Sequence, residues 1–174
     1  DAAKPPCWLA LDSIMDPQNL GSILRSAYFF GVDGVVVCSR NSAPLGPVVA
    51  KASSGALECV ELYSTSTLPR FLKRCVETGW TTMGATCTEA TDKPLLDVSS
   101  LGLSTGPTIL VVGNEGEGLR AGVAEQCTKL VRVQSTNPMP VDFIDSLNVG
   151  VATGVLLHSM IGMRRDSAPA SEEK

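Results

Sequence analysis

The sequence predicts an α/β domain with a mainly parallel sheet and helices on both of its faces. Short apolar runs of strand length alternate with amphipathic runs of helical length along most of the 174 residues. Parallel strands joined by crossover helices produce this alternation. Hydrophobic residues make up 44% and charged residues 18%, which indicates a globular chain. A chain of this length buries roughly two-thirds of its unfolded surface, so we expect one domain.

The first expected strand covers residues 7–14 and leads into a helix over 16–31. Asp16 is the predicted N-cap, Pro17 occupies the first helical position, and Gly31 follows the last turn. Leu20 and Leu24 belong to an apolar stripe at helical spacing. The next elements are expected to be strands at 34–38, 57–63 and 80–86, and helices at 47–53 and 66–79.

The second half of the chain continues the pattern after a long loop, 87–107, with a short helical turn expected near 94–98. Strands are expected at 108–113 and 129–133, and helices at 118–127 and 146–165. Asp145 or Ser146 is the expected cap of the last helix. The polar tail 166–174 is expected to be disordered.

Composition excludes several classes of protein. No apolar run reaches the ~18 residues of a membrane span, so we expect no membrane partner. The six cysteines form no C-x-x-C pair, which favours reduced, buried thiols over disulfides or a metal site. His158, the single histidine, is interpreted as a packed or edge residue rather than a catalytic one. The net charge of −4 argues against nucleic-acid binding by bulk electrostatics alone, although it permits a local basic patch. The chain begins at Asp1, so we expect a piece of a longer protein.

A glycine-rich loop follows the strand at 108–113, in the stretch TILVVGNEGEGLR. Glycines let a backbone approach a ligand closely, yet this loop carries Glu115 and Glu117 and no lysine. A phosphate cradle would favour the opposite charge. The order G-x-x-G-x-G also differs from the dinucleotide-binding G-x-G-x-x-G, which makes a dinucleotide-dependent enzyme a minor alternative. A plain tight turn is the other interpretation.

Two helices present unusual polar residues at the same edge of the predicted sheet, where ligands bind in such folds. The first helix carries Arg25 on a polar stripe with small neighbours; its guanidinium suits phosphate, although a solvated face is the simpler interpretation. The last helix begins with Asn148, a poor helix former, and continues with Gly150 and Gly154, which allow close approach of another segment.

At these residues the chain resembles a known family. The segments DPQNLGSILRSAYFFGV, LVVGNEGEGL and SLNVGVATGVLL resemble, in order and spacing, the three signature motifs of SpoU-type RNA 2′-O-ribose methyltransferases of the SPOUT superfamily. The resemblance covers about residues 8–163. The segment RNSAPLGPVVAKASSGALECV adds a likeness to the bacterial and mitochondrial enzymes that methylate a guanosine in the peptidyl-transferase region of large-subunit rRNA.

The resemblance implies S-adenosylmethionine as methyl donor, a C-terminal trefoil knot, RNA as substrate, and a homodimer with its active sites at the interface. Residues 1–165 would form the methyltransferase domain, and the N-terminal RNA-binding domain of similar enzymes is not visible here. A mitochondrial location is implied first, with chloroplast or bacterial cytoplasm as alternatives. A tRNA 2′-O-methyltransferase and a catalytically silent SPOUT module that binds RNA or ribosomes are the alternative functions.

By motif position the resemblance also implies roles for individual residues. The catalytic positions are Asn19, Arg25, Glu115, Ser146 and Asn148. The donor-binding positions are Thr86, Gly113, Asn114, Gly116, Gly118, Val133 and Leu147, and a local RNA track would use Arg25, Arg40, Lys51 and Arg120. A guanidinium is a poor base, so gripping the adjacent phosphate and stabilising the alkoxide is the easier role for the arginine of the first helix. The loop at 134–145 is about five residues longer than in most relatives, which leaves its donor contacts open.

Overall fold

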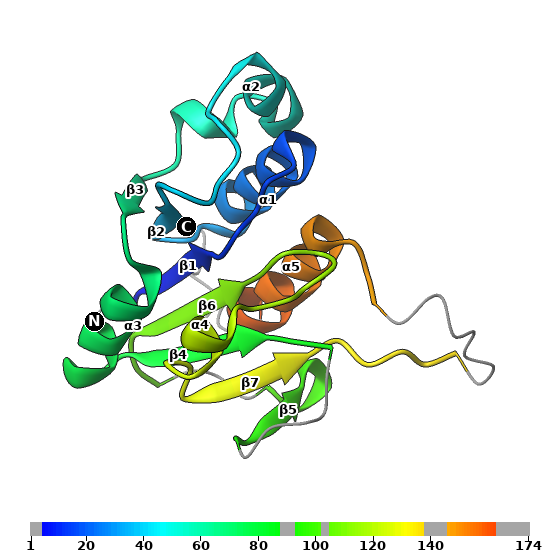
Figure 1. Ribbon diagram of the computed structural model, residues 1–174. Coiled ribbons are helices and arrows are strands. Elements are labelled where there is room, and N and C mark those ends of the chain that lie inside the picture. Colours follow the sequence, from blue (N-terminus) through cyan, green and yellow to red (C-terminus); the bar gives the residue numbers. More distant parts are fainter. Residues whose placement is uncertain (1–4, 88–92, 102–104, 138–145, 163–174) are drawn as a thin grey trace, which may run out of the picture.

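The computed structural model describes residues 5–87, 93–101, 105–137 and 146–162. Seven described strands form one sheet in the order β3-β2-β1-β6-β4-β7-β5, and every pairing between them is parallel (Figure 1). The strands are β1 Cys7–Leu11, β2 Gly34–Cys38, β3 Leu62–Thr65, β4 Thr81–Ala85, β5 Leu95–Asp97, β6 Thr108–Val112 and β7 Lys129–Arg132. The predicted α/β class with a parallel sheet is therefore confirmed.

Five α-helices are described, and they cover both faces of the sheet (Figure 1). They are α1 Pro17–Phe30, α2 Pro47–Ser53, α3 Leu68–Glu77, α4 Ala121–Ala124 and α5 Val149–Leu157. Side chains alternate between two apolar clusters along the central strands: Leu9 and Leu11 join α1 and α5, whereas Ala10 joins α3 and α4. This two-residue period explains why the strand sequences are apolar throughout, because both faces are buried.

The first helix forms as its sequence predicts. Asp16 accepts a hydrogen bond from the backbone N of Gln18 at 2.9 Å, Pro17 begins the helix, and Gly31 ends it in the left-handed region at φ 70°. These signals are local, so they survive the tertiary context. The short helix at 47–53 also has the predicted bounds.

One predicted strand has the wrong bounds, and one predicted helical turn is wrong. Residues 57–63 were expected to be a strand, but Ser54 and Gly55 turn through left-handed backbone into a 3₁₀ turn, Ala56–Glu58, and the chain enters the sheet only at Leu62. The expected helical turn at 94–98 is instead the edge strand β5, followed by a 3₁₀ turn, Val98–Ser100. Leu95 and Leu96 pack against opposite apolar clusters, which is the geometry of a strand.

The helix expected at 118–127 is only the single turn α4. Lys93 Nζ donates to the backbone carbonyls of Ala124, Glu125 and Cys127 at 2.8, 2.6 and 2.6 Å. In a longer helix, backbone N–H groups of the next turn would donate to carbonyls at these positions. Here the Lys93 ammonium donates to them instead, which stabilises the end of the helix at this point.

The last helix begins later than predicted, because Asn148 is its N-cap. Its Oδ1 accepts from the backbone N of Gly150 at 2.9 Å and of Val151 at 3.3 Å. The helix continues as a π-helical turn, His158–Gly162. Of the two expected caps, Ser146 lies before the helix, and Asp145 lies outside the described residues, as do the tail 166–174 and most of the 134–145 loop.

The cysteines follow the expectation of buried thiols only in part. All six are described, and none forms a disulfide; Cys7, Cys38 and Cys127 are buried, Cys75 is half-buried, and Cys59 and Cys87 are exposed. Within the described ranges no group of histidine, cysteine and acidic side chains could hold a metal ion. Across the same ranges, the helices are too short or too polar to cross a bilayer. His158 is exposed and lies beside the ring of Phe30, with ring centroids 6.0 Å apart.

The register of the central strands places the polar segments side by side. Leu11 of β1 pairs with Val112 of β6, so Asp12 and Gly113 leave the sheet next to each other at its carboxyl edge. The chain proceeds from β1 toward β2 and β3 and later returns to place β6 on the other side of β1. A switch in strand order of this kind opens a crevice where ligands bind in α/β folds.

Candidate active site at the carboxyl edge of the sheet

The main cavity lies beyond the carboxyl ends of β4, β6 and β7. Its walls come from residues 85–87 after β4, residues 112–115 and Gly118 of the glycine loop, and residues 131–133 at the end of β7. Ser146, Leu147 and four residues of α5 close the remaining side. Four segments that are distant in sequence therefore form one concave surface, as expected for a small-molecule site.

The structure brings most of the predicted donor-binding residues into this cavity. Six of the seven line it: Thr86, Gly113, Asn114, Gly118, Val133 and Leu147. The seventh, Gly116, lines a neighbouring cavity. Sequence reasoning missed Ala85, Cys87 and Arg132, which enter the wall because they lie at or just after the carboxyl ends of β4 and β7. In the sheet β4 is next to β6, and β7 is next to β4.

The glycine loop folds tightly on itself. Asn114 and Gly118 exchange backbone hydrogen bonds of 3.0 and 2.9 Å, and Asn114 Oδ1 accepts from the backbone N of Gly116 at 2.9 Å. Gly118 has φ +68°, in the left-handed region. A Cβ added to Gly113 would lie 2.3 Å from the carbonyl oxygen of Gly118. The sequence therefore needs glycine at the start of this loop for space and at its end for backbone conformation.

A second cavity lies between the glycine loop and the start of α1. It is lined by residues 14–16, Asn19, residues 114–116 and Val149. Asn114, Glu115 and Val149 line both cavities, so these residues form the partition between them. A ligand in the main cavity and a second group in the second cavity would meet at this partition.

Three predicted catalytic residues meet through hydrogen bonds at the partition. Asn148 Nδ2 donates to Asn19 Oδ1 at 3.0 Å and to Glu115 Oε1. The same Glu115 oxygen accepts from the backbone N of Val149 at 3.3 Å. Because Asn148 Oδ1 caps α5, both the oxygen and the nitrogen of its side-chain amide are hydrogen-bonded. The network fixes the orientation of the Glu115 carboxylate and of the Asn19 amide at the edge of both cavities.

The other two predicted catalytic residues lie elsewhere. Ser146 is exposed and lines the main cavity. Arg25 lines neither cavity: it is exposed on α1, and its Nη1 donates to Ser54 Oγ at 3.1 Å, beyond the end of α2. Arg40 and Lys51 are exposed and also line neither cavity. Within one chain, these three residues of the predicted basic track lie outside the walls of both cavities, whereas the fourth, Arg120, directly follows the glycine loop.

Helices α1 and α5 run side by side in register. A Cβ on Gly150 would lie 2.7 Å from Ser22 Oγ, and one on Gly154 would lie 3.7 Å from Ser26 Oγ. Phe30, one turn further, contacts the ring of His158. The small residues predicted to thin this face of α5 thus allow the close approach that places Asn148 beside Asn19.

The two charged residues that line the main cavity lie on different sides of it, and only the arginine is paired with a residue of opposite charge. Arg132 lies in the wall, and its Nε donates to Asp97 Oδ1 at 2.7 Å, so a neighbouring carboxylate offsets its charge. Glu115 lies on the opposite, glycine loop side. The cavity therefore suits a ligand with a cationic centre and no phosphate better than it suits a nucleotide di- or triphosphate.

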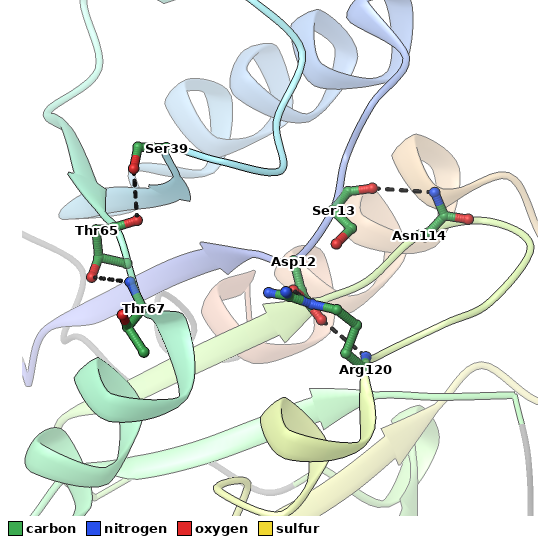
Figure 2. Close-up of polar contacts among 7 residues, drawn as sticks. All are labelled: Asp12, Ser13, Ser39, Thr65, Thr67, Asn114 and Arg120. Carbon is green, nitrogen blue, oxygen red and sulfur yellow. Dashed lines mark hydrogen bonds and ion pairs between the residues drawn. The ribbon is translucent and has the colours of Figure 1, made fainter.

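Sequence reasoning missed Asp12, a fully buried carboxylate directly after β1. Its Oδ1 accepts from Arg120 Nε at 2.7 Å, and its Oδ2 accepts from the Arg120 backbone N at 3.0 Å (Figure 2). The hydrogen bond with Asp12 is the main cause that raises the pKa of Arg120 above its ordinary value. An acidic residue that ends an apolar strand run, CWLALD, was the available signal for this residue.

Comparison with known proteins finds a matching family and several relatives. Residues 6–158 match the SpoU rRNA methylase family. The human protein "rRNA methyltransferase 1, mitochondrial" is 41% identical over 173 residues, which cover 96% of this chain and 48% of the human protein. The "23S rRNA (guanosine-2'-O-)-methyltransferase RlmB" of Pseudomonas aeruginosa is 40% identical over 159 residues, 91% of this chain and 60% of that protein. The chain thus spans about half the length of these relatives.

Solved structures give the same result for the fold. A TrmH-family protein from Porphyromonas gingivalis superposes with a TM-score of 0.78 at 30% identity, covering 96% of this chain and 62% of that one. The SpoU methyltransferase AviRb of Streptomyces viridochromogenes, solved with S-adenosylmethionine, superposes with a TM-score of 0.76 at 24% identity, covering 97% and 61%. With the family match spanning most of its length, this chain belongs to the SpoU rRNA methylase family.

Proposed function

We propose that this chain transfers a methyl group from S-adenosylmethionine to a ribose 2′-hydroxyl of RNA. The observation that carries the proposal is the meeting of Asn19, Glu115 and Asn148 at the partition between the two cavities. Family membership supports the reaction, and the names of the human and Pseudomonas relatives support rRNA, and a guanosine in large-subunit rRNA, as the target. Since the chain spans about half of these relatives, the activity of the whole protein is part of the proposal.

The main cavity is the proposed S-adenosylmethionine site. The donor carries a sulfonium cation and no phosphate, which matches a wall that combines Glu115 with a paired Arg132. The bare backbone around Gly113 and Gly118 lets the chain close on the ligand, and the apolar side chains of Val133 and Leu147 exclude water. When bound, the donor supplies the reactive methyl group.

The second cavity, between the glycine loop and α1, is the proposed entry for the ribose. Glu115 Oε1 is engaged by Asn148 and by the backbone N of Val149, so the carboxylate holds one orientation. We assign its second oxygen to the incoming hydroxyl, with Asn19 and Ser146 as further polar contacts. Fixing the hydroxyl in line with the methyl group is the main contribution of these residues, because methyl transfer depends on approach geometry.

Arg25 is proposed to act on the site of a second copy of the chain. It lines neither cavity of its own chain, and it lies on α1, where Phe29 is 76% exposed. Val151 is 54% exposed on the neighbouring helix α5. Large apolar side chains exposed on two adjacent helices are typical of an interface, which supports the homodimer. At the partner's site the Arg25 guanidinium would bind the phosphate beside the target ribose and stabilise the alkoxide.

Three wider features of the family belong to the same proposal. The trefoil knot would form in the C-terminal third, between β7 and α5, the helix that packs against α1. The basic residues Arg40 and Lys51 would contact RNA, together with an N-terminal RNA-binding domain outside this chain. The mitochondrial relatives support a mitochondrial location.

Transfer of labelled methyl from S-adenosylmethionine into large-subunit rRNA tests the activity. We expect transfer to the ribose form of the target and none when the target nucleotide is 2′-deoxy, because the hydroxyl is the acceptor. A matched tRNA substrate identifies the alternative target class. Binding of the donor without transfer to any RNA would contradict the proposed enzyme and favour the silent binding module.

Mixing two inactive variants tests the shared site. Arg25→Ala and Asn148→Ala each lose transfer, but a mixed dimer contains one site with both native residues, so about one quarter of the parent activity should return. Arg74→Ala, an exposed arginine on α3, is the matched control and should keep full activity. No recovery in mixtures that form mixed dimers would contradict a site built from two chains.

A further inference from the structure

One dipeptide, Asp12–Ser13, holds both ends of the glycine loop. At the near end, the backbone N of Asp12 donates to the carbonyl of Val112 at 2.8 Å, and Asn114 Nδ2 donates to the carbonyl of Ser13 at 3.1 Å. At the far end, the Asp12 carboxylate accepts from the backbone N, Nε and Nη2 of Arg120 at 3.0, 2.7 and 2.5 Å. Figure 2 shows the two attachments on either side of the loop.

The contact between Asp12 and Arg120 joins a fully buried side chain to a partly exposed one. Asp12 has no exposed surface, whereas the Arg120 side chain is 40% exposed. Arg120 lies 108 residues further along the chain, directly after the loop and before α4. Two side-chain nitrogens of Arg120 contact Asp12 Oδ1, and the Arg120 backbone N donates to Asp12 Oδ2. Because both the side chain and the backbone are held, the position and the direction of the chain are fixed at this point.

The same dipeptide also sets the start of α1. Ser13 has a φ of 60°, a left-handed conformation that turns the chain from β1 toward the N-cap Asp16. Asn19 then follows in the first turn of α1 and accepts from Asn148. The loop and the helix that supply Glu115 and Asn19 to the partition therefore start from one attachment point.

We propose that Asp12 is a positioning residue of the active site: through Arg120 it holds the glycine loop closed against β1, in the shape that receives S-adenosylmethionine. The inference rests on the proposed function for the identity of the ligand. It assigns Arg120, also predicted to contact RNA, to the structure of the loop. Asp12 itself lines neither cavity, so it acts only through the residues that it holds.

The choice of variant follows from burial. Removing Arg120 leaves the Asp12 charge buried without its partner, which threatens folding, whereas Asp12→Asn leaves a partly exposed arginine that water can solvate. Asp12→Asn is therefore the main variant, and the double variant Asp12→Asn with Arg120→Gln keeps the shapes without either charge. Thr82→Val is the control: it removes a buried hydrogen bond from the opposite end of the sheet.

The test compares donor binding and amide hydrogen exchange in the full chain and its variants. We expect Asp12→Asn to raise the Kd for S-adenosylmethionine about tenfold or more, to speed exchange in residues 113–120, and to leave the KM for RNA within about twofold. Thr82→Val should lower the melting temperature without either effect. The double variant should resemble Asp12→Asn, because the two residues act as one unit.

Two results would overturn the inference. In the first, folded Asp12→Asn binds the donor and exchanges its loop amides as the parent does. In the second, Thr82→Val changes both measurements as much as Asp12→Asn does, at the same melting temperature. If the parent itself binds no S-adenosylmethionine, the proposed function fails, while loop exchange still decides whether Asp12 holds the loop. If Asp12→Asn does not fold, the double variant carries the same measurements.

Discussion

The two ends of the parallel sheet use polar residues in different ways. At the amino end, Thr82 and Thr128 bond each other: each backbone N donates to the other's hydroxyl, at 3.2 and 3.0 Å, and the Thr82 hydroxyl donates to the carbonyl of Gln126 at 2.8 Å. At the carboxyl end, Glu115 and Asn148 also bond each other, but they do so beside two cavities.

The difference separates stability from function. Polar groups at the amino end are satisfied by the protein itself, so their removal should lower the free energy of unfolding and leave ligand binding unchanged. Those at the carboxyl end orient atoms toward space that a ligand can fill. Their removal should change binding or methyl transfer by more than their contribution to stability. The predictions below test this contrast.

Gly113→Ala should produce the largest effect. The added Cβ would lie 2.3 Å from the carbonyl oxygen of Gly118, so the loop has to open. Overpacking of this kind also strains the backbone, and we expect donor affinity measured by calorimetry to fall at least about 100-fold. Gly106→Ala is the matched control, because an added Cβ there meets nothing within 4 Å. Equal affinity in the two variants would contradict the donor site.

Two substitutions of Asn148 separate its contribution to helix capping from its contribution to methyl transfer. Asn148→Ala removes the N-cap of α5 and should cost about 1 kcal/mol of unfolding free energy. It also removes the donor to Asn19 and Glu115, and we expect methyl transfer to fall about 100-fold. Asn148→Asp keeps a capping oxygen but places a second carboxylate beside Glu115. It should retain stability and still lose transfer; a variant that retained both would contradict the role of the amide.

Local signals in the sequence predicted local structure well. Asp16, Pro17 and Gly31 set the bounds of α1 because each acts on backbone within one helical turn. The glycine loop and Asn148 were also recognisable, since both break the pattern expected for regular elements. The predicted cap of α5 was nevertheless wrong, because the residue interpreted as an odd first-turn residue is the cap itself.

Features that depend on contacts across the chain could not be predicted in this way. Asp12 and Arg120 are 108 residues apart, and nothing in either local pattern indicates the other. The strand β5 has only three residues and forms because β7 offers a free edge to it. The side chain of Arg25 was expected at the site, yet it lines neither cavity of its own chain and donates to Ser54 Oγ. Its contribution to a partner's site remains part of the proposed dimer.

Thr82→Val tests the amino end of the sheet. The variant keeps the shape of the side chain but removes the hydroxyl, so the carbonyl of Gln126 loses this donor. The backbone N of Thr128 loses one of two acceptors and keeps the carbonyl of Thr82, at 2.9 Å. We expect the free energy of unfolding in urea to fall by about 1–2 kcal/mol. Donor affinity should stay within about twofold of the parent, because Thr82 lines neither cavity. A large loss of donor affinity in Thr82→Val would contradict the separation of stability at the amino end from ligand binding at the carboxyl end.

The smallest expected effect is a pH dependence of stability that arises from Cys127. Burial raises the pKa of its thiol from 9.0 to about 11, against an opposing effect of the Lys93 ammonium. Below pH 9 the thiol is protonated in both the folded and the unfolded chain, so its contribution to stability is complete. Between pH 9 and 11 the unfolded chain loses this proton while the folded chain keeps it, and stability falls as pH rises. By pH 10 the loss due to this group should be about 1 kcal/mol.

Urea unfolding of the parent and Cys127→Ala at pH 8 and pH 10 isolates this contribution. Other groups that titrate in this range contribute to both proteins, so the difference between their two pH slopes belongs to Cys127. The variant should be less stable at pH 8, because it loses buried volume, and should lose less stability on going to pH 10. Identical slopes would mean that the thiol reaches solvent in the folded state. Since Cys127 packs between α4 and β7, away from both cavities, donor affinity should not differ between the two proteins at either pH.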